Sequence, residues 1–288
     1  MRREIKKVLL FLSLTFLFNY ISAFLFAALG GKWNTPGAYL MAAGYMFVPM
    51  VMAIAVQKFH KEPIKKPLGI SWKLNRWWLF AWLLPPAVAL ATFGVSLLLP
   101  GVEYSPEMAG FFERFKGVLP PERLEAMRHQ AEMLPVHPFW FGLIQGLIAG
   151  ITINAIAGFG EELGWRGLLY RELSFLGFWR SSALIGAIWG IWHAPLILQG
   201  HNYPQHPVVG ALMMTVWCMF LSPIFNFIRL KAKSVIAASI LHGSLNATSG
   251  LALVLVEGGS DLTVGVTGAS GFIVLGAVNL GIYLTFRR

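Results

Sequence analysis

The chain has little charge and almost no cysteine for its length. Asp, Glu, Lys and Arg make up only 12% of its 288 residues, about half of the ~25% that is usual in soluble domains. This shortage excludes an ordinary soluble domain. Cys218 is the single cysteine, which excludes an internal disulfide and the paired-cysteine spacings of a structural zinc site. The sequence also has no internal repeat, low-complexity tract or soluble domain boundary.

Hydrophobic residues, in contrast, make up 56% of the chain and occur in long runs. A run of about 20 apolar residues is long enough to cross a bilayer as a helix. The first run follows a basic segment, as in a signal peptide, but it exceeds the length of about 7–15 residues of such a signal, so we expect a retained anchor. We predict an all-α, polytopic membrane protein that forms a single transmembrane domain over residues 1–288. About eight spans are expected, near residues 8–29, 38–56, 77–99, 138–160, 181–199, 207–228, 234–256 and 266–286.

The distribution of Lys and Arg predicts the orientation of these spans. Alternating the spans from a cytoplasmic N-terminus assigns 18 of the 23 basic residues to inside segments. The five outside residues are Lys32, Arg114, Lys116, Arg123 and Arg128. Cytoplasmic loops carry such an excess, so we expect a multi-pass cell-membrane protein whose N- and C-termini are both cytoplasmic. The net charge of +10 then faces anionic lipid headgroups, and no nucleic-acid partner is needed to explain it.

Residues 101–137 form an outside segment with helical patterning. Ser105 is positioned to cap a helix that begins with Pro106 and Glu107. Two apolar stripes follow, namely Met108, Phe111, Phe112, Phe115, Val118 and Leu119, and then Leu124, Met127, Ala131 and Leu134. Such interfacial helices are expected to lie flat on the bilayer, either as a connector or as a lid that gates the substrate.

A few ionisable residues lie inside the predicted spans. Glu161, Glu162 and Arg166 lie at the end of the fourth span, and His193 and His242 lie within the fifth and seventh. A charge at the centre of a membrane helix costs about 2.5–3.5 kcal/mol on insertion scales, so such residues indicate a functional site. The other five histidines lie in loops or at span edges, where they need no special function, namely His60, His129, His137, His201 and His206.

The spacing of the charged residues predicts different tasks for the two glutamates. Glu162 and Arg166 are four residues apart and share a helix face, so we expect an ion pair. Glu161 points about 100° away and is left for chemistry. Glycines surround the pair at Gly158, Gly160, Gly164 and Gly167. They allow either close helix approach or room for water and an extended substrate.

The two histidines have neighbours at the same helical spacing. His242 and Asn246 present two polar groups side by side, and Trp189 places an indole beside His193. From their depths in the spans, we expect these groups to converge in the cytoplasmic half of the bilayer, in a cavity that opens to the cytoplasm.

Pro195 provides an expected anchor for His193. Proline cannot donate a hydrogen bond to the carbonyl of Ile191, four residues earlier. We therefore expect that free carbonyl to lie near His193 and to fix the tautomer of its imidazole.

Taken together, these motifs resemble the CAAX-protease and bacteriocin-processing (CPBP) family of intramembrane proteases, also called the abortive-infection family, and its type II CAAX prenyl proteases. The family motifs are Glu-Glu-x-x-x-Arg, an aromatic-x-x-x-His and His-x-x-x-Asn, in that order. Here they are Glu161-Glu162 with Arg166, Trp189 with His193, and His242 with Asn246. The family often has Phe where this chain has Trp189. The resemblance covers about residues 138–250, and we expect the catalytic core near 138–256.

The resemblance implies an enzyme that cleaves a peptide bond within the membrane. In the mechanism that it implies, Glu161 and His193 activate a water, and His242 and Asn246 stabilise the oxyanion. The supporting residues are Glu162, Arg166 and Trp189. We favour chemistry without a metal cofactor, and the alternative is a zinc ion held by Glu161, His193 and His242. The implied partners are the lipid bilayer and a peptide or membrane-protein substrate, lipidated or not.

Three other functions stay open at this point. In a proton-coupled transporter, the buried carboxylates would relay protons, but this leaves His193 and His242 unexplained. In a haem protein, the two histidines would be axial ligands, but this leaves the glutamate pair unexplained. A catalytically silent family member would act as an immunity protein or scaffold. The sequence predicts neither the substrate nor the oligomeric state.

Overall fold

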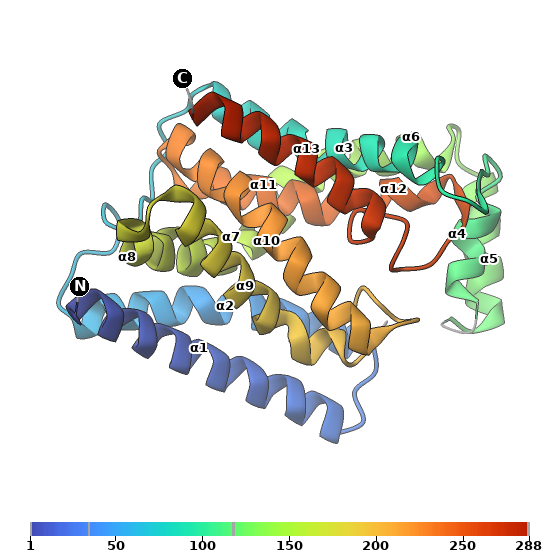
Figure 1. Ribbon diagram of the computed structural model, residues 1–288. Coiled ribbons are helices and arrows are strands. Elements are labelled where there is room, and N and C mark those ends of the chain that lie inside the picture. The colour runs from blue at the N-terminus through green and yellow to red at the C-terminus, as the bar shows by residue number, and fades with distance from the viewer. Residues whose placement is uncertain (1, 34, 117–118, 287–288) are drawn as a thin grey trace.

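The computed structural model describes residues 2–33, 35–116 and 119–286, and it is mostly helical (Figure 1). The longer helices are α1 (Arg2–Ala28), α2 (Pro36–Phe59), α3 (Arg76–Ser96), α9 (Phe178–Ile197), α10 (Pro207–Ala232) and α13 (Ala269–Phe286). Helices of intermediate length are α5 (Pro121–Glu132), α6 (Pro138–Ile151), α7 (Ile153–Glu162) and α11 (Val235–Thr248). The short elements are β1 (Val102–Tyr104), α4 (Ala109–Phe115), the π-helix η1 (Leu163–Leu169), α8 (Tyr170–Leu173), the 3₁₀ turn η2 (Ser174–Leu176), α12 (Leu251–Val254) and β2 (Val256–Gly258). Of the residues used in the predictions above, Val118, Arg287 and Arg288 lie outside the described residues.

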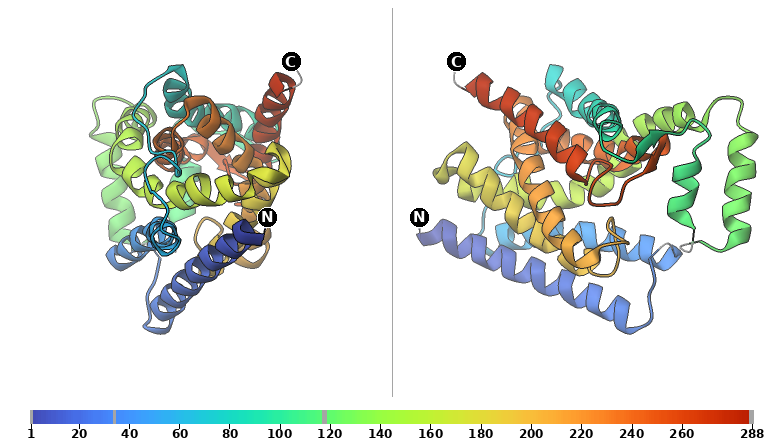
Figure 2. Two further views of the ribbon diagram at one scale, coloured as in Figure 1. Left: turned by 90° about the vertical axis from the view of Figure 1, so that its left-hand side faces the viewer. Right: turned by 45° about the vertical axis from the view of Figure 1, so that its right-hand side comes forward.

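The long helices run between two ends of the molecule (Figures 1 and 2). α1 begins and α13 ends at the same end, on the left in Figure 1. That end also holds the 60–75 segment and the turns at 174–177 and 233–234, and we call it the basic end. The opposite end holds residues 29–33, the described part of 97–137, and the segments 198–206 and 249–268, and we call it the far end. These two groups of segments are the ones that the distribution of basic residues assigns to opposite sides of the membrane.

The predicted class, a polytopic helical membrane protein, is confirmed. Within the described residues, five helical segments are long and apolar enough to cross a membrane, namely Glu4–Ala28, Gly37–Phe59, Arg76–Ser96, Pro207–Ala232 and Ala269–Phe286. A sixth is added if Pro138–Ile151 and Ile153–Leu176, which are bent by 49° at their junction, count as one broken span. By length and composition the described residues therefore contain five or six candidate spans, fewer than the eight predicted.

Two of the predicted spans do not meet this description, one because its helix is too short and the other because it carries several polar residues. α11 has only 14 residues, about 21 Å at 1.5 Å per residue, which is shorter than the ~30 Å hydrocarbon core. α9 has 20 residues but includes Arg180, two serines and His193. α9 packs on α10, and α11 packs on α7, α6 and α3, so both helices pack largely against protein.

The 101–137 segment is helical only in part. α4 begins at Ala109 instead of Pro106, although Ser105 Oγ accepts a hydrogen bond from the Ala109 amide at 3.1 Å. β1 pairs antiparallel with β2, with Val102 opposite Gly258, and strands of three residues are too short to be recognised from alternation. α4 packs against β2 and α12, whereas the side chains of α5 are exposed or half-buried. Both helices lie at the far end (Figure 1).

Candidate active site

The site is built on the segment that joins α7 to α8. α7 ends with Glu161 and Glu162, and the backbone continues as the π-helix η1, which carries Arg166. π-Helical turns are rare and occur frequently at functional sites. Glu162 and Arg166 still pair as their spacing predicts, with 3.2 Å between Arg166 Nη1 and Glu162 Oε1. All seven residues of η1 are buried.

α7 and α11 approach closely because each presents glycine to the other. A Cβ on Gly243 of α11 would lie 2.4 Å from the amide nitrogen of Ala155, and a Cβ on Gly158 of α7 would lie 2.9 Å from the Cβ of His242. Real Cβ atoms do not approach other atoms so closely, so larger residues would push the helices apart. This contact brings His242 beside the two glutamates.

The other glycines near the glutamate pair also lie close to atoms of neighbouring segments. A Cβ on Gly160 would lie 2.7 Å from the carbonyl oxygen of Met46, and a Cβ on Gly164 would lie 2.7 Å from Pro49 Cβ. Gly167 faces the carbonyl of Leu68 at 3.2 Å. Of the two roles predicted for these glycines, the structure supports close packing and leaves no room beside them for a substrate.

Glu162 is the centre of a buried chain of charged groups. Its Oε1 lies 3.2 Å from Arg166 Nη1 and 2.7 Å from His242 Nδ1. An ionised carboxylate only accepts, so the imidazole donates from Nδ1. The Arg166 guanidinium lies 4.4 Å from the ring centre of Trp189 and 4.6 Å from that of Phe225, and such cation–π contacts compensate in part for its burial. Glu162 Oε2 and Arg166 Nε and Nη2 have no hydrogen-bond partner within the described residues.

Glu161 is held by two indoles. Its Oε2 accepts hydrogen bonds from Trp189 Nε1 at 2.7 Å and from Trp165 Nε1 at 3.3 Å. Its other oxygen, Oε1, lies 3.9 Å from His242 Nε2. This separation is too long for a direct hydrogen bond and is short enough for a water to bridge the two atoms. The division predicted from the spacing therefore appears in the contacts: Glu162 pairs with the arginine, and Glu161 does not.

His193 is anchored differently from the prediction. Its Nδ1 lies 2.8 Å from the carbonyl oxygen of Trp189. The carbonyl of Ile191, which Pro195 was expected to leave free for His193, instead accepts a hydrogen bond from Tyr20 at 2.7 Å. A carbonyl only accepts, so Nδ1 of His193 carries hydrogen, and in the neutral ring Nε2 is left as the acceptor.

One cavity of about 280 Å³ brings the predicted catalytic residues together. Glu161, His193, His242 and Asn246 all line it, and so does Trp189. Glu162 and Arg166 are not among its lining residues. The rest of the wall is mostly apolar or aromatic, with Ala42, Tyr45, Met46, Trp192, Leu196, Met214, Trp217, Leu245 and Val266, together with His201, Asn202, Ser249 and Thr267.

The cavity lies toward the far end, whereas the sequence predicted an opening to the side of the chain termini. α2, α9, α10 and α11 contribute residues from the parts nearer the far end, such as Ala42–Met46 of α2 and Leu245 and Asn246 near the end of α11, whereas Glu161 comes from the last turn of α7. Its remaining wall comes from the far-end segments, with His201 and Asn202 from one and Val266 and Thr267 from another. The depth estimate from sequence treated each span separately, and it could not show toward which end the side chains converge.

Several cavity residues were not predicted from sequence. Tyr45 donates a hydrogen bond to the carbonyl of Trp192 at 2.7 Å, and Asn19 joins both residues, accepting from Trp192 Nε1 at 2.9 Å and donating to the Tyr45 carbonyl at 2.9 Å. The available sequence signal was the presence of an amide, Asn19, in an apolar run, and the structure shows this amide to be fully buried. His201 also lines the cavity, although its loop position gave no reason to choose it.

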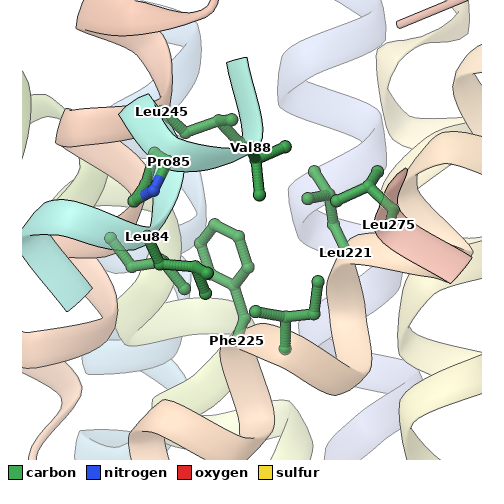
Figure 3. Close-up of a pocket in the computed structure, with 9 residues that line it drawn as sticks. Leu84, Pro85, Val88, Leu221, Phe225, Leu245 and Leu275 are labelled. Atoms are coloured by element: carbon green, nitrogen blue, oxygen red, sulfur yellow. The ribbon is translucent and has the colours of Figure 1, made fainter. Parts of the chain in front are cut away.

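A second, much smaller cavity lies behind Phe225. It has a volume of about 20 Å³, and its labelled walls in Figure 3 are side chains of α3, α10, α11 and α13, including Leu84, Leu221 and Leu275. All its lining residues are apolar, and such voids stay dry. It is therefore a small packing void beside Phe225, the ring that contacts the Arg166 guanidinium, and it is no candidate site for a polar ligand.

Cys218 lies close to His193 but outside the cavity wall. Its Sγ is 3.9 Å from Nδ1 of His193, the nitrogen that the Trp189 carbonyl already occupies. Cys218 is fully buried. Cys218 is therefore a small packed residue and not a candidate nucleophile.

The residues do not fit the alternative zinc site. Among the described residues, no group of three His, Cys, Asp or Glu side chains is arranged to hold a metal ion. Glu161 uses one oxygen for the two indoles, and Nδ1 of His193 is bound to a backbone carbonyl.

The comparisons with known proteins agree with the resemblance noted in the sequence. Residues 135–248 match the model of the Rce1-like family, described as type II CAAX prenyl endopeptidase Rce1-like. Comparison with curated proteins gives no match. The matched range begins just before α6 and ends with α11, so it includes all three motifs and every predicted catalytic residue. Residues 135–248 of this membrane protein are thus a domain of the Rce1-like type II CAAX prenyl endopeptidase (CPBP) family.

Proposed function

We propose that this protein is an intramembrane endopeptidase in which Glu161, His193, His242 and Asn246 carry out the hydrolysis. The family implies an intramembrane protease and a peptide substrate. The observation that carries the finer proposal is that these four side chains, from three different helices, line one cavity, whereas the charged pair Glu162–Arg166 does not.

Glu161 is the general base of this proposal. Two indole donors hold its Oε2, so Oε1 is left for a water in the cavity. His193 presents Nε2 as a second acceptor, because its Nδ1–H is bound to the Trp189 carbonyl. A water that donates to both acceptors is oriented for attack on a peptide carbonyl carbon.

His242 and Asn246 are the oxyanion donors. Glu162 holds Nδ1 of His242 and turns Nε2 toward Glu161. Two carboxylates and one guanidinium form the buried charged cluster, and a proton on His242 balances their charge, so that Nε2 donates a hydrogen bond. Asn246 follows one helical turn later and contributes its amide N–H. Fixed donors at a developing oxyanion lower the barrier by about 2.7–4 kcal/mol each.

The proposed reaction balances without a covalent enzyme intermediate. Oε1 of Glu161 takes one proton from the water as its oxygen bonds to the peptide carbon, and the carbonyl oxygen becomes an oxyanion. When the C–N bond breaks, that proton passes from Glu161 to the leaving nitrogen. The immediate products are a carboxylic acid and an amine, and the glutamate returns to its ionised state. The acid then gives its remaining proton to the amine, which leaves a carboxylate and an ammonium group.

The test compares protein termini in membranes that contain active and inactive enzyme. Cells producing the wild-type chain, Glu161→Gln or the control Glu113→Gln at equal levels are analysed by proteomics of peptide N- and C-termini. Glu113 lies on α4 in an exposed pair with Lys116, so its variant should cleave normally. Termini that occur with the wild-type chain and the control should be lost with Glu161→Gln. If Glu161→Gln produces the same termini, the proposed role of Glu161 is wrong.

A further inference from the structure

We infer that the catalytic cavity opens on the non-cytoplasmic side of the membrane and takes its peptide from there. The substrate class would be extracytoplasmic segments of exported peptides or membrane proteins. The part of the inference that concerns the substrate rests on the proposed function, whereas the side on which the cavity opens does not. Three observations carry it.

The first observation is that polar residues of the far end form the outer wall of the cavity. Ser249, Thr267 and Asn202 belong to the segments that follow α11, precede α13 and join α9 to α10. These segments are joined to one another: Tyr203 donates to the carbonyl of Thr267 at 2.7 Å, and Asp261 accepts from the Gln205 amide at 2.8 Å. Asn246, which lines the same wall, is exposed. The cavity thus leads from Glu161 to the far end.

The second observation is that the protein is closed between the cavity and the basic end. Leu163, Trp165, Arg166, Leu168 and Leu169 of η1 are at most 1% exposed. Beyond them, Lys7 is fully buried and bridges Glu62 at 2.7 Å and Glu172 at 2.9 Å. A peptide that approached from the basic end would have to unpack η1 and break this network.

The third observation is the difference in charge between the two ends. The far end carries five Lys and Arg residues and eight acidic ones, the latter being Glu103, Glu107, Glu113, Glu122, Glu125, Glu132, Glu257 and Asp261. Of the other 18 Lys and Arg residues, the 16 that the structure describes belong to the basic end, or to η1, which leads to it. Lys and Arg in short segments favour the cytoplasm, so the basic end is cytoplasmic and the cavity opens on the opposite side.

Charge and cavity position together change the expected substrate. A prenylated C-terminus in the cytoplasm would meet the basic end, where the protein is closed. An extracytoplasmic peptide would meet the far end, where the cavity wall offers aromatic and aliphatic side chains for its apolar residues and polar groups for its backbone.

Cysteine labelling tests the side of the opening. On a Cys218→Ala background, Ser249→Cys and Thr267→Cys place a thiol in the cavity wall, and Ser174→Cys places one at the basic end, where Ser174 is exposed. Each variant is treated with a membrane-impermeant maleimide in right-side-out and in inverted vesicles, and SDS-unfolded samples give the total thiol. The cavity cysteines should be labelled in right-side-out vesicles only, and Ser174→Cys in inverted vesicles only. Labelling of the cavity cysteines in inverted vesicles, or from neither side, would overturn the inference.

A second measurement separates the inference from the proposed function. Labelling is repeated with Ser249→Cys combined with Glu161→Gln, because access does not require catalysis, and the same pattern is expected. The termini that depend on Glu161 should map to extracytoplasmic segments. If they map to cytoplasmic C-termini, the inference fails while the proposed function holds. The third outcome is that the labelling matches the expected pattern but no terminus depends on Glu161. In that case the proposed catalytic role and the substrate part of the inference both fail, while the inferred side of the cavity opening holds.

Discussion

At the scale of single residues, two adjacent glutamates have separate environments. Glu161 lies in the cavity wall with one oxygen held by indoles, whereas Glu162 is fully buried between Arg166 and His242. The two glutamates are adjacent in sequence, but adjacent side chains on a helix point in different directions, so the two carboxylates contact different neighbours. The same pair therefore supplies both a candidate base and the structural charge that orients His242.

We expect Glu162→Gln to lower stability strongly. It leaves Arg166 buried without a negative partner, and breaking a buried pair in this way costs about 3–5 kcal/mol. Melting in detergent should show a clear loss for Glu162→Gln and little change for Glu161→Gln. Adding Arg166→Leu to Glu162→Gln should recover part of the loss, because no uncompensated charge then stays buried. A Glu162→Gln variant that melts like the wild-type chain would contradict this assignment.

We expect His242→Ala and Asn246→Ala each to slow turnover by about 10²–10³-fold, the effect of removing one oxyanion donor. The double variant should lose less than the product of the single effects, because both donors act on one charge. Asn246→Asp keeps the size of the side chain but lacks the N–H, so it should be as slow as Asn246→Ala. Rates are measured on the folded fraction, since His242 also contacts Glu162. Normal turnover by Asn246→Asp would exclude the amide as a donor.

At the scale of elements, the site depends on the contact between α7 and α11. Gly243 and Gly158 allow the backbones to approach, as small residues do in membrane helix pairs. η1 follows α7 directly and places Arg166 beside Glu162, next to the same contact. The catalytic candidates lie on α7, α9 and α11. Contacts with other helices determine the positions of these three helices, and α9 and α11 lack the length or hydropathy of a lipid-facing span.

We expect Gly243→Ala to lower both stability and turnover. Its Cβ would lie 2.4 Å from the backbone of Ala155 and of Gly150, and overpacking of this kind costs about 1–3 kcal/mol. The control is Gly94→Ala in α3, where no described atom lies within 4 Å of the added Cβ. Detergent melting and cleavage are measured on both. Equal behaviour of the two variants would show that the close approach is not required.

At the scale of the whole molecule, the two ends have different tasks. The far end contributes the outer wall of the cavity and holds the described part of the 101–137 segment. The basic end is held together by ion pairs that join α1, the segment after α2, and α8. Lys7 contacts Glu62 and Glu172, and Arg171 contacts Glu62 at 2.9 Å. Burial raises the pKa of the Glu62 carboxyl, but the hydrogen bonds and charges of Lys7 and Arg171 outweigh it and hold the pKa below its usual range.

We expect this network to make stability depend on pH. The pKa of Glu62 is lower in the folded state than in the unfolded chain, where it is about 4.3. Its contribution is therefore fully present above about pH 4.3 and is lost as the pH falls through the folded-state value. Glu62→Gln should melt at a lower temperature than the wild-type chain at pH 7, and the difference should shrink below pH 4. Glu113→Gln, which removes an exposed pair, should show neither effect.

The sequence predicted those parts of the site that depend on local spacing. The ion pair of Glu162 with Arg166 and the neighbouring rings of Trp189 and His193 follow from positions four residues apart on one helix. The anchor of His193 was wrong because Tyr20 takes the Ile191 carbonyl, and Tyr20 belongs to another helix. The two-stranded ladder of β1 and β2 was missed because its partners lie about 150 residues apart and each strand has three residues.

The sequence by itself determined that this is a helical membrane protein with a basic and a less basic side, because hydropathy, run length and charge distribution are sums over local residues. It also identified the four catalytic candidates, whose roles stay a prediction. Only the tertiary structure decided that Glu161 and Glu162 both face His242, 81 and 80 positions further along the chain, that glycines serve helix contact, and that the cavity leads to the far end. These properties depend on which helices pack together and in which direction their side chains converge, and no local pattern contains that information.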